Sequence, residues 1–136
     1  MPPSTATSSL AATAPSVKQA AKKLPAPNSD FYQFAETLSA DELAILKRVR
    51  VFMETKVAPI INKYWIEDAF PFEVLPAFKE LNVGGLGIQG YDCPGGSQLL
   101  VGLVAMQMAR FDASIATFFG VHSGLALGSI ALVGSR

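Results

Sequence analysis

The segment "GLGIQG", Gly85 to Gly90, has the Gly-x-Gly-x-x-Gly spacing that lets a backbone approach the diphosphate of a dinucleotide. That chemistry requires a strand before the glycines and a helix directly after them. Here the helical pattern "PAFKEL" precedes the glycines, and the loop-forming segment "YDCPGG" follows them. The context therefore favours a turn that ends a helix over a dinucleotide site.

His122 is the only histidine of the chain, and no Asp or Glu lies within one helical turn of it. It therefore has no local partner for a metal site or for a catalytic triad. Two interpretations of His122 follow. It is either a packed or hydrogen-bonded core residue, or a residue that lines a pocket.

The other reactive residue types also lack partners. Cys93 is the single cysteine, which excludes an internal disulfide, and no basic residue near it would stabilise a thiolate. Glu67 and Asp68 are adjacent, so on a helix they point in different directions and predict a solvated surface rather than an acid–base pair. We therefore assign no catalytic residue and no metal ligand from these residues.

The segment from Ala113 to Val133 contains no Asp, Glu, Lys or Arg, which permits a membrane span, a buried core helix or the wall of a binding site. At about 1.5 Å per residue it is long enough to cross a hydrocarbon core of about 30 Å. Ser, Thr and His side chains dilute it and no Trp or Tyr flanks it, so we expect a buried helix without stable membrane insertion. Small residues recur at spacing four, where another backbone or a slender ligand can approach: Ala116, Gly120, Gly124 and Gly128.

The elements that must position these residues all follow the helical period. Ser39 and Glu42 form a Ser-x-x-Glu capping box that starts a helix, and Pro59 should break this helix near Ala58. The apolar positions of this helix recur at three and four: Ile45, Val49, Phe52, Met53, Val57 and Ile60.

Three further helices are predicted downstream. The segment "FPFEVLPAFKELNVGGLGI" is a shorter helix that restarts at Pro76 and ends at Gly84 and Gly85. Ser97 caps "QLLVGLVAMQMAR", which is apolar nearly all round and belongs in a core, and Asp112 caps the last helix. No segment alternates as a strand does, so the sequence predicts an all-α fold.

Composition limits the possible partners and the domain organisation. A formal net charge of +0 over 136 residues supplies no positive field, so we expect no nucleic-acid partner. Residues 1–29 are rich in Ala, Ser, Thr and Pro and contain no acidic residue, which predicts a disordered leader. The segment also resembles an organelle transit peptide, although it lacks the Arg residues typical of one. Aromatic residues first appear in "SDFYQF", so we expect one helical domain over residues 30–136.

Three segments, in this order, resemble the N-terminal helical domain of acyl-CoA dehydrogenases and acyl-CoA oxidases. They are "LSADELAILKRVRVFMETKVAPIINKYW", "FPFEVLPAFKELNVGGLGIQGYDCPGGS" and "MARFDASIATFFGVHSGLALGSIALVGS". The distinctive parts are Val-Ala-Pro at 57–59, the loop at 90–95 and Ala-Arg-x-Asp at 109–112. With "SDFYQF" and "VHSGLALGSIALVGS" added, the chain is similar to the plant-type peroxisomal short-chain acyl-CoA oxidases.

This resemblance implies the FAD-dependent oxidation of short-chain acyl-CoA to 2-enoyl-CoA in fatty acid β-oxidation. In the family a carboxylate removes the α-proton and the flavin accepts the β-hydrogen as hydride. Oxidases then pass the electrons to O₂ and produce H₂O₂, whereas dehydrogenases pass them to an electron-transfer flavoprotein. The resemblance also implies a homo-oligomer for the full-length enzyme and a peroxisomal location, with the mitochondrion as the alternative.

The resemblance ends before the family's middle β-domain and C-terminal helical domain, which hold its glutamate base and most flavin contacts. We therefore expect the chain alone to be truncated before the middle β-domain, to be inactive and, with its apolar helices uncovered, to associate. The residues that the resemblance implies for the acyl-pocket wall are Phe118, Phe119, Val121 and His122.

Other functions are compatible with the same sequence. One is a non-catalytic helical module that binds a homologous full-length subunit or a lipid in an apolar groove, and another is a small membrane protein. A third is part of an acyl-CoA or glutaryl-CoA dehydrogenase. Glutaryl-CoA dehydrogenases have an arginine where this chain has Ala116, which disfavours a dicarboxylyl substrate.

Overall fold

The computed structural model describes residues 30–134, and the leader expected at residues 1–29 lies outside them. The described part of the chain is helical and has no β-strand, which confirms the predicted all-α fold class. The 3₁₀-helices are η1 and η3, and the π-helices are η2 and η4. In chain order the elements are η1 (Phe34–Thr37), α1 (Ala40–Phe52), η2 (Met53–Val57), α2 (Ile61–Ile66), η3 (Phe72–Val74), α3 (Leu75–Glu80), α4 (Gln98–Ala109), α5 (Ala113–Phe119), η4 (Gly120–Ala126) and α6 (Leu127–Val133).

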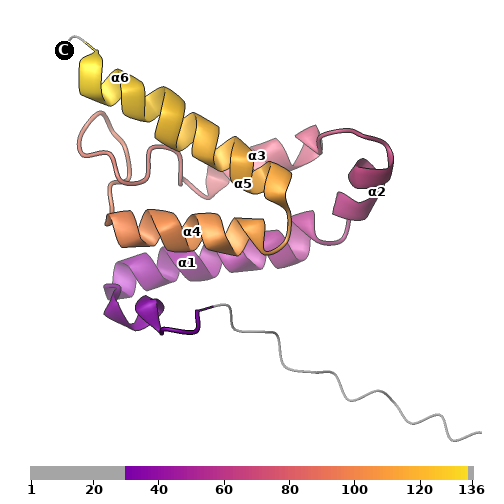
Figure 1. The fold of residues 1–136 in the computed structure, drawn as a ribbon, viewed down its shortest axis with the longest axis horizontal. Coiled ribbons are helices and arrows are strands. Elements are labelled where there is room, and N and C mark those ends of the chain that lie inside the picture. Colours follow the sequence, from indigo (N-terminus) through magenta and orange to yellow (C-terminus); the bar gives the residue numbers. More distant parts are fainter. Residues whose placement is uncertain (1–29, 135–136) are drawn as a thin grey trace, which may run out of the picture.

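Helix α4 lies between α1 and the run formed by α5, η4 and α6 (Figure 1). Its start is capped as predicted, because the Ser97 hydroxyl accepts a hydrogen bond from the backbone N–H of Leu100 at 3.1 Å. Leu100, Val104 and Met108 are fully buried, which confirms that this apolar helix belongs in the core. Its one buried amide, Gln107, accepts a hydrogen bond from the Arg50 side chain of α1 at 3.3 Å.

One carboxylate joins the starts of α1 and α4. The predicted capping box is present: Ser39 donates its backbone N–H to Glu42 at 3.1 Å, and Glu42 donates its backbone N–H to the Ser39 hydroxyl at 3.3 Å. The second carboxylate oxygen of Glu42 accepts the backbone N–H of Ser97 at 2.9 Å. The capping box therefore also fixes α1 against α4, which no local pattern indicated.

The break at Pro59 is confirmed. The π-helix η2 ends at Val57, the backbone N–H of Ala58 bonds to the carbonyl of Met53 at 2.8 Å, and α2 begins only at Ile61. Proline has no N–H to continue the ladder, so the chain turns here. Of the six apolar positions predicted for the helix before this break, four are buried and the outer two, Ile45 and Ile60, are half-buried against the core.

Helix α3 ends earlier than predicted. It stops at Glu80, and Asn82, with φ of 52°, takes the left-handed conformation that we expected from Gly84 and Gly85. Asparagine tolerates that conformation because its short polar side chain bonds locally. The glycines instead belong to a long loop over residues 81–97, called the glycine loop below, in which Gly85 and Gly87 also have positive φ.

Replacing Glu42 with Gln is expected to lower the free energy of unfolding at neutral pH, because an amide cannot accept the same set of hydrogen bonds. Hydrogen bonds from Ser97, and then from Ser39, lower the pKa of Glu42 from 4.5 to about 2. A lowered pKa in the folded state means that this stabilisation is present above the ordinary pKa of 4.5 and is lost as the pH falls toward 2. Urea unfolding of wild type and variant should therefore differ most above pH 4.5 and converge near pH 2.

The matched control is Asp41→Asn, which removes a carboxylate from the same first turn of α1 without removing the bond to Ser97. Its effect should be smaller and should come from the helix dipole alone. If the difference in the free energy of unfolding between wild type and Glu42→Gln stays constant across the acid range, the stabilisation does not depend on the ionisation of Glu42.

Candidate functional site

The helix that carries the predicted site residues starts at Asp112, a carboxylate that is only 3% exposed. Its Oδ1 atom accepts the backbone N–H of Ile115 at 2.8 Å, which confirms the predicted cap. Its Oδ2 atom accepts the indole N–H of Trp65, on α2, also at 2.8 Å. The sequence pattern indicated the cap but not the bond to Trp65, because the partner lies 47 positions away.

Elements α5, η4 and α6 form one continuous helix from Ala113 to Val133, called the site helix below. Its middle, Gly120–Ala126, is π-helical. Turns of π-helix are rare and occur often at functional sites, because the extra residue per turn re-aims the side chains that follow. Val121 and His122 lie in this π-helical segment.

The predicted site residues occupy two sides of the site helix. Phe119 is 2% exposed and packs in the core, whereas Phe118 is half-buried, Val121 is 42% exposed and His122 is exposed. Residues three and four apart share one face of a helix, so Phe118, Val121 and His122 lie together with Leu125 on a surface called the outer face below. The structure therefore groups three of the predicted residues and separates Phe119 from them.

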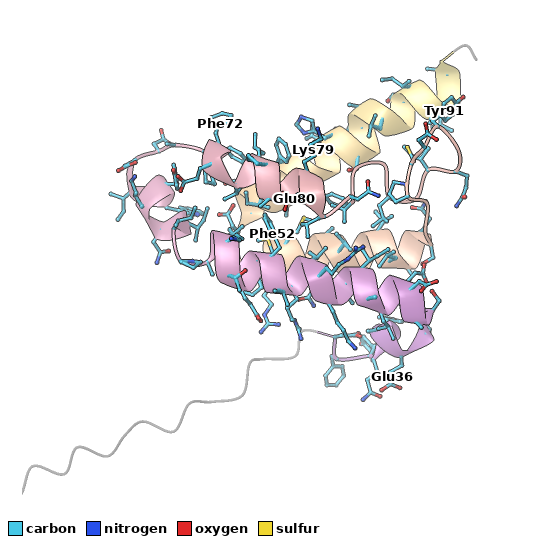
Figure 2. All side chains as sticks on the ribbon, turned by 180° about the vertical axis from the view of Figure 1, so that it is seen from behind. Glu36, Phe52, Phe72, Lys79, Glu80 and Tyr91 are labelled. Carbon is cyan, nitrogen blue, oxygen red and sulfur yellow. The ribbon has the colours of Figure 1, made fainter. Side chains whose placement is uncertain are left out.

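Phe118 sits in a cluster of rings that come from four helical elements, α1, α3, α5 and η4, and from the loop before η3. Its ring centroid is 5.4 Å from that of Phe78, 5.5 Å from that of Phe70 and 4.1 Å from that of His122. Phe78 in turn contacts Phe52 of α1 at 5.9 Å, and Phe52 lies between α1 and α3 (Figure 2). These five residues are called the ring cluster below.

His122 is exposed, so the interpretation as a core residue is wrong. Its ring is nevertheless held, because Nδ1 lies 2.8 Å from the carbonyl oxygen of Phe118. A carbonyl oxygen can only accept, so Nδ1 carries the proton and Nε2 is left as the acceptor of the neutral ring. His122 therefore presents one fixed hydrogen-bond acceptor at the edge of an otherwise apolar face.

A groove of about 680 Å³ lies on another side of the site helix. One wall is Phe119, Gly120, Ser123, Gly124 and Gly128, a second is formed by α4, and the third by the glycine loop. A side-chain carbon added at Gly120 or Gly124 would meet no atom within 4 Å, so these two glycines of the predicted row face open space. The residues that line the groove carry no charge, but Gln89, Gln98 and Ser123 bring polar groups into it.

The prediction of a buried helix is wrong for the second half of the site helix. Leu125, Ile130, Leu132 and Val133 are 67%, 66%, 87% and 84% exposed. Helix α6 extends beyond α4, and only the glycine loop lies beside it (Figure 1). That contact encloses a small apolar cavity of about 110 Å³ lined in part by Cys93 and Leu127.

By length and composition alone, the site helix is also the one helix within residues 30–134 that could cross a membrane. This criterion is weak, because apolar core helices meet it as well. The absence of stable membrane insertion therefore stays a prediction.

The remaining sequence candidates are resolved by their positions. The pattern Gly85–Gly90 lies inside the glycine loop, with neither a strand before it nor a helix directly after it, so it is neither a dinucleotide site nor the end of α3. Glu67 and Asp68 are exposed, as expected for a solvated surface. Within the described residues, no group of His, Cys, Asp and Glu could hold a metal ion.

The fold and the site define an all-α domain with one uncharged, partly open helix at its edge. A family model described as "Acyl-CoA dehydrogenase, N-terminal domain" matches residues 39–136. The match covers most of the chain, so the chain belongs to the acyl-CoA dehydrogenase family and contains its N-terminal domain. This family acts on acyl-CoA thioesters and generally uses FAD.

The groove offers no charged group to the diphosphate of FAD. No Lys, Arg, Asp or Glu lines the groove beside the site helix, so no cation there would neutralise a diphosphate. We therefore assign no FAD contact to this chain.

Removing the Asp112 carboxylate should weaken the fold measurably. Asp112→Ala leaves the N–H groups of Ile115 and Trp65 without their acceptor, and we expect it to reduce the free energy of unfolding by about 2 kcal/mol. Trp65→Phe removes one of the two bonds and should cost about 1 kcal/mol. Urea unfolding followed by far-ultraviolet circular dichroism measures both losses.

The double variant separates this bond from unrelated effects. Because both single changes remove the same Trp65–Asp112 bond, the double variant should cost less than the sum of the two. Asp112→Asn is the control, since its amide oxygen still caps the helix. Strictly additive losses would show that the bond seen in the structure does not stabilise the fold.

Proposed function

We propose that this domain forms part of the acyl-binding wall of an FAD-dependent acyl-CoA oxidase that acts on short-chain acyl-CoA. The observation that carries the proposal is the outer face of the site helix, where Phe118, Val121 and His122 lie together without a charged neighbour in the helix. The free energy falls when an alkyl chain moves from water onto an apolar surface, and an uncharged surface of this kind can receive it. Membership of the acyl-CoA dehydrogenase family supplies the class of substrate.

The reaction proposed for the complete enzyme removes one hydrogen from the α-carbon and one from the β-carbon of the acyl group. The product is 2-enoyl-CoA, and O₂ takes up both hydrogens to become H₂O₂. FAD, when bound, supplies the two-electron chemistry between them. What this chain contributes is a surface that excludes water from the alkyl group.

The catalytic base is proposed to lie outside this chain. No Asp or Glu occurs between Ala113 and Val133, so the outer face offers no carboxylate to an α-proton. We do not propose His122 as the base, because its Nδ1 atom is hydrogen-bonded to the carbonyl oxygen of Phe118 in its own helix. The chain of 136 residues alone should therefore not turn over acyl-CoA.

Assembly and location belong to the same proposal. We propose a homo-oligomer for the complete enzyme and a peroxisomal location, with the mitochondrion as the alternative, and the support is the sequence resemblance. Co-localisation of the complete tagged protein with a peroxisomal or a mitochondrial marker decides between the two.

The direct test measures oxygen uptake and H₂O₂ release by the complete, FAD-loaded enzyme with butyryl-CoA. We expect stoichiometric H₂O₂ without any added electron acceptor. If turnover requires an electron-transfer flavoprotein and yields no H₂O₂, the enzyme is an acyl-CoA dehydrogenase. If no acyl-CoA is oxidised under either condition, the proposal is wrong.

Placing a charge on the outer face should impair the enzyme without unfolding it. Val121→Asp puts a carboxylate where the alkyl chain is proposed to lie, and KM for butyryl-CoA should rise about tenfold or more because the charge loses its water when substrate binds. Val51→Asp on α1 is the matched control, since Val51 is 56% exposed and lies away from the outer face. Equal effects of the two variants would argue against a substrate contact at Val121.

The exposed apolar residues of α6 favour a second candidate function. Leu132 and Val133 present apolar area that a homologous subunit or a lipid would bury. Under this alternative the chain is a non-catalytic binding module. Co-purification with a full-length subunit, without any acyl-CoA oxidation by the complex that depends on this chain, would support it over the oxidase.

A further inference from the structure

A cavity of about 240 Å³ lies between η1, α1 and α4, where η1 meets the start of α1 (Figure 1), and is called the η1 cavity below. It shares no residue with the groove beside the site helix. Pockets that hold drug-sized ligands have about 300 to 1,000 Å³, so the η1 cavity suits a smaller molecule. The apolar part of its lining comes from all three elements: Ala35, Leu43, Leu46 and Leu103.

One buried amide presents a hydrogen-bond donor to the η1 cavity. Gln107 is 4% exposed, and its side-chain oxygen accepts the Nε–H of Arg50 at 3.3 Å. Arginine can only donate, so the amide oxygen must face Arg50 and the amide nitrogen is left for another partner. That nitrogen bonds to no group within residues 30–134, yet it is not enclosed, because the one enclosed side-chain atom without a partner in that range is Nη1 of Arg110. The space that Gln107 lines is the η1 cavity.

Two cations border the same cavity. Arg50 uses Nε for the bond to Gln107, which leaves the N–H groups on both terminal nitrogens of its guanidinium as donors. Neither Arg50 nor Lys47 forms an ion pair within the described part of the chain. Asp30 and Glu36 also line the cavity, but both oxygens of Asp30 accept backbone N–H groups of η1, at 2.9 and 2.7 Å, and Glu36 is exposed. An amide donor and two cations therefore border one small volume.

We propose that the η1 cavity binds a short aliphatic carboxylate. Its two oxygens accept hydrogen bonds from the guanidinium of Arg50 and the amide of Gln107, because a planar guanidinium matches the geometry of a carboxylate. Lys47, which is exposed, adds a second positive charge at the rim. The alkyl group lies against Leu46 and Leu103, so the site favours an organic anion over an inorganic one. The inference is independent of the proposed function, because no residue of the site helix lines this cavity.

The test titrates the chain of 136 residues with sodium hexanoate in a calorimeter, with acetate and inorganic phosphate as comparison ligands. We expect one equivalent of hexanoate to bind, about tenfold or more tightly than acetate, because each buried methylene adds to the affinity. Arg50→Met removes a charged donor and should weaken hexanoate binding about tenfold or more. Lys47→Met changes an exposed side chain and should weaken it about threefold, and it provides the comparison should the Arg50 variant fail to fold.

The matched control is Arg48→Met, which removes a neighbouring cation of α1 that does not line the η1 cavity. It should leave the affinity for hexanoate unchanged. If hexanoate does not bind, or if Arg48→Met weakens it as much as the Arg50 and Lys47 variants do, the η1 cavity is not a carboxylate site. If inorganic phosphate binds as tightly as hexanoate, the leucines contribute nothing and the assigned class of ligand is wrong.

Discussion

The buried carboxylate of Asp112 is the interaction on which the site depends. An α-helix turns by a fixed angle per residue, so the position of its first turn decides which side chains of α5 point outward before the π-helical segment begins. Asp112 holds that first turn twice, once through the backbone N–H of Ile115 and once through the indole of Trp65. The outer face and the groove wall are therefore set from one end of the site helix.

Glu42 has the corresponding role at the other side of the core. It closes the capping box of α1 and also bonds the backbone N–H of Ser97 at the start of α4. Helix α4 then packs between α1 and α5, so Glu42 joins α1 to the start of α4 whereas Asp112 joins the start of α5 to α2. In both cases a group that satisfies helix N–H donors also bonds another element of the fold. Local capping and tertiary packing are thus coupled in this domain.

The site helix joins two surfaces of different character. Its outer face ends in packed rings and is rigid there, whereas the side with Gly120 and Gly124 borders an open groove. The π-helical segment lies between α5, where Ile115 and Phe119 are buried, and α6, where no residue is buried. The side chains of Leu132 and Val133 are left exposed to water, which is unfavourable for apolar surface.

The amino-acid sequence by itself determined the all-α class, the caps at Ser39, Ser97 and Asp112, and the break at Pro59. Each of these depends on residues within about one helical turn, where hydrogen-bonding capacity and backbone restriction act directly. The predicted end of α3 was wrong, because glycine takes the left-handed conformation more readily than asparagine and Gly84 and Gly85 were therefore preferred to Asn82. The exposed position of His122 could not be predicted, because composition shows that a helix is apolar but not which parts its neighbours cover.

Only the tertiary structure decided which residues meet. The ring cluster draws on segments from Phe52 to His122, and the bonds of Glu42 to Ser97 and of Asp112 to Trp65 cross 55 and 47 positions. Such contacts form when helices pack, and no periodicity along the chain records them. The sequence therefore specified the helices and their uncharged stretch, while packing specified which face is covered, so that Phe119 lies inside and His122 is exposed.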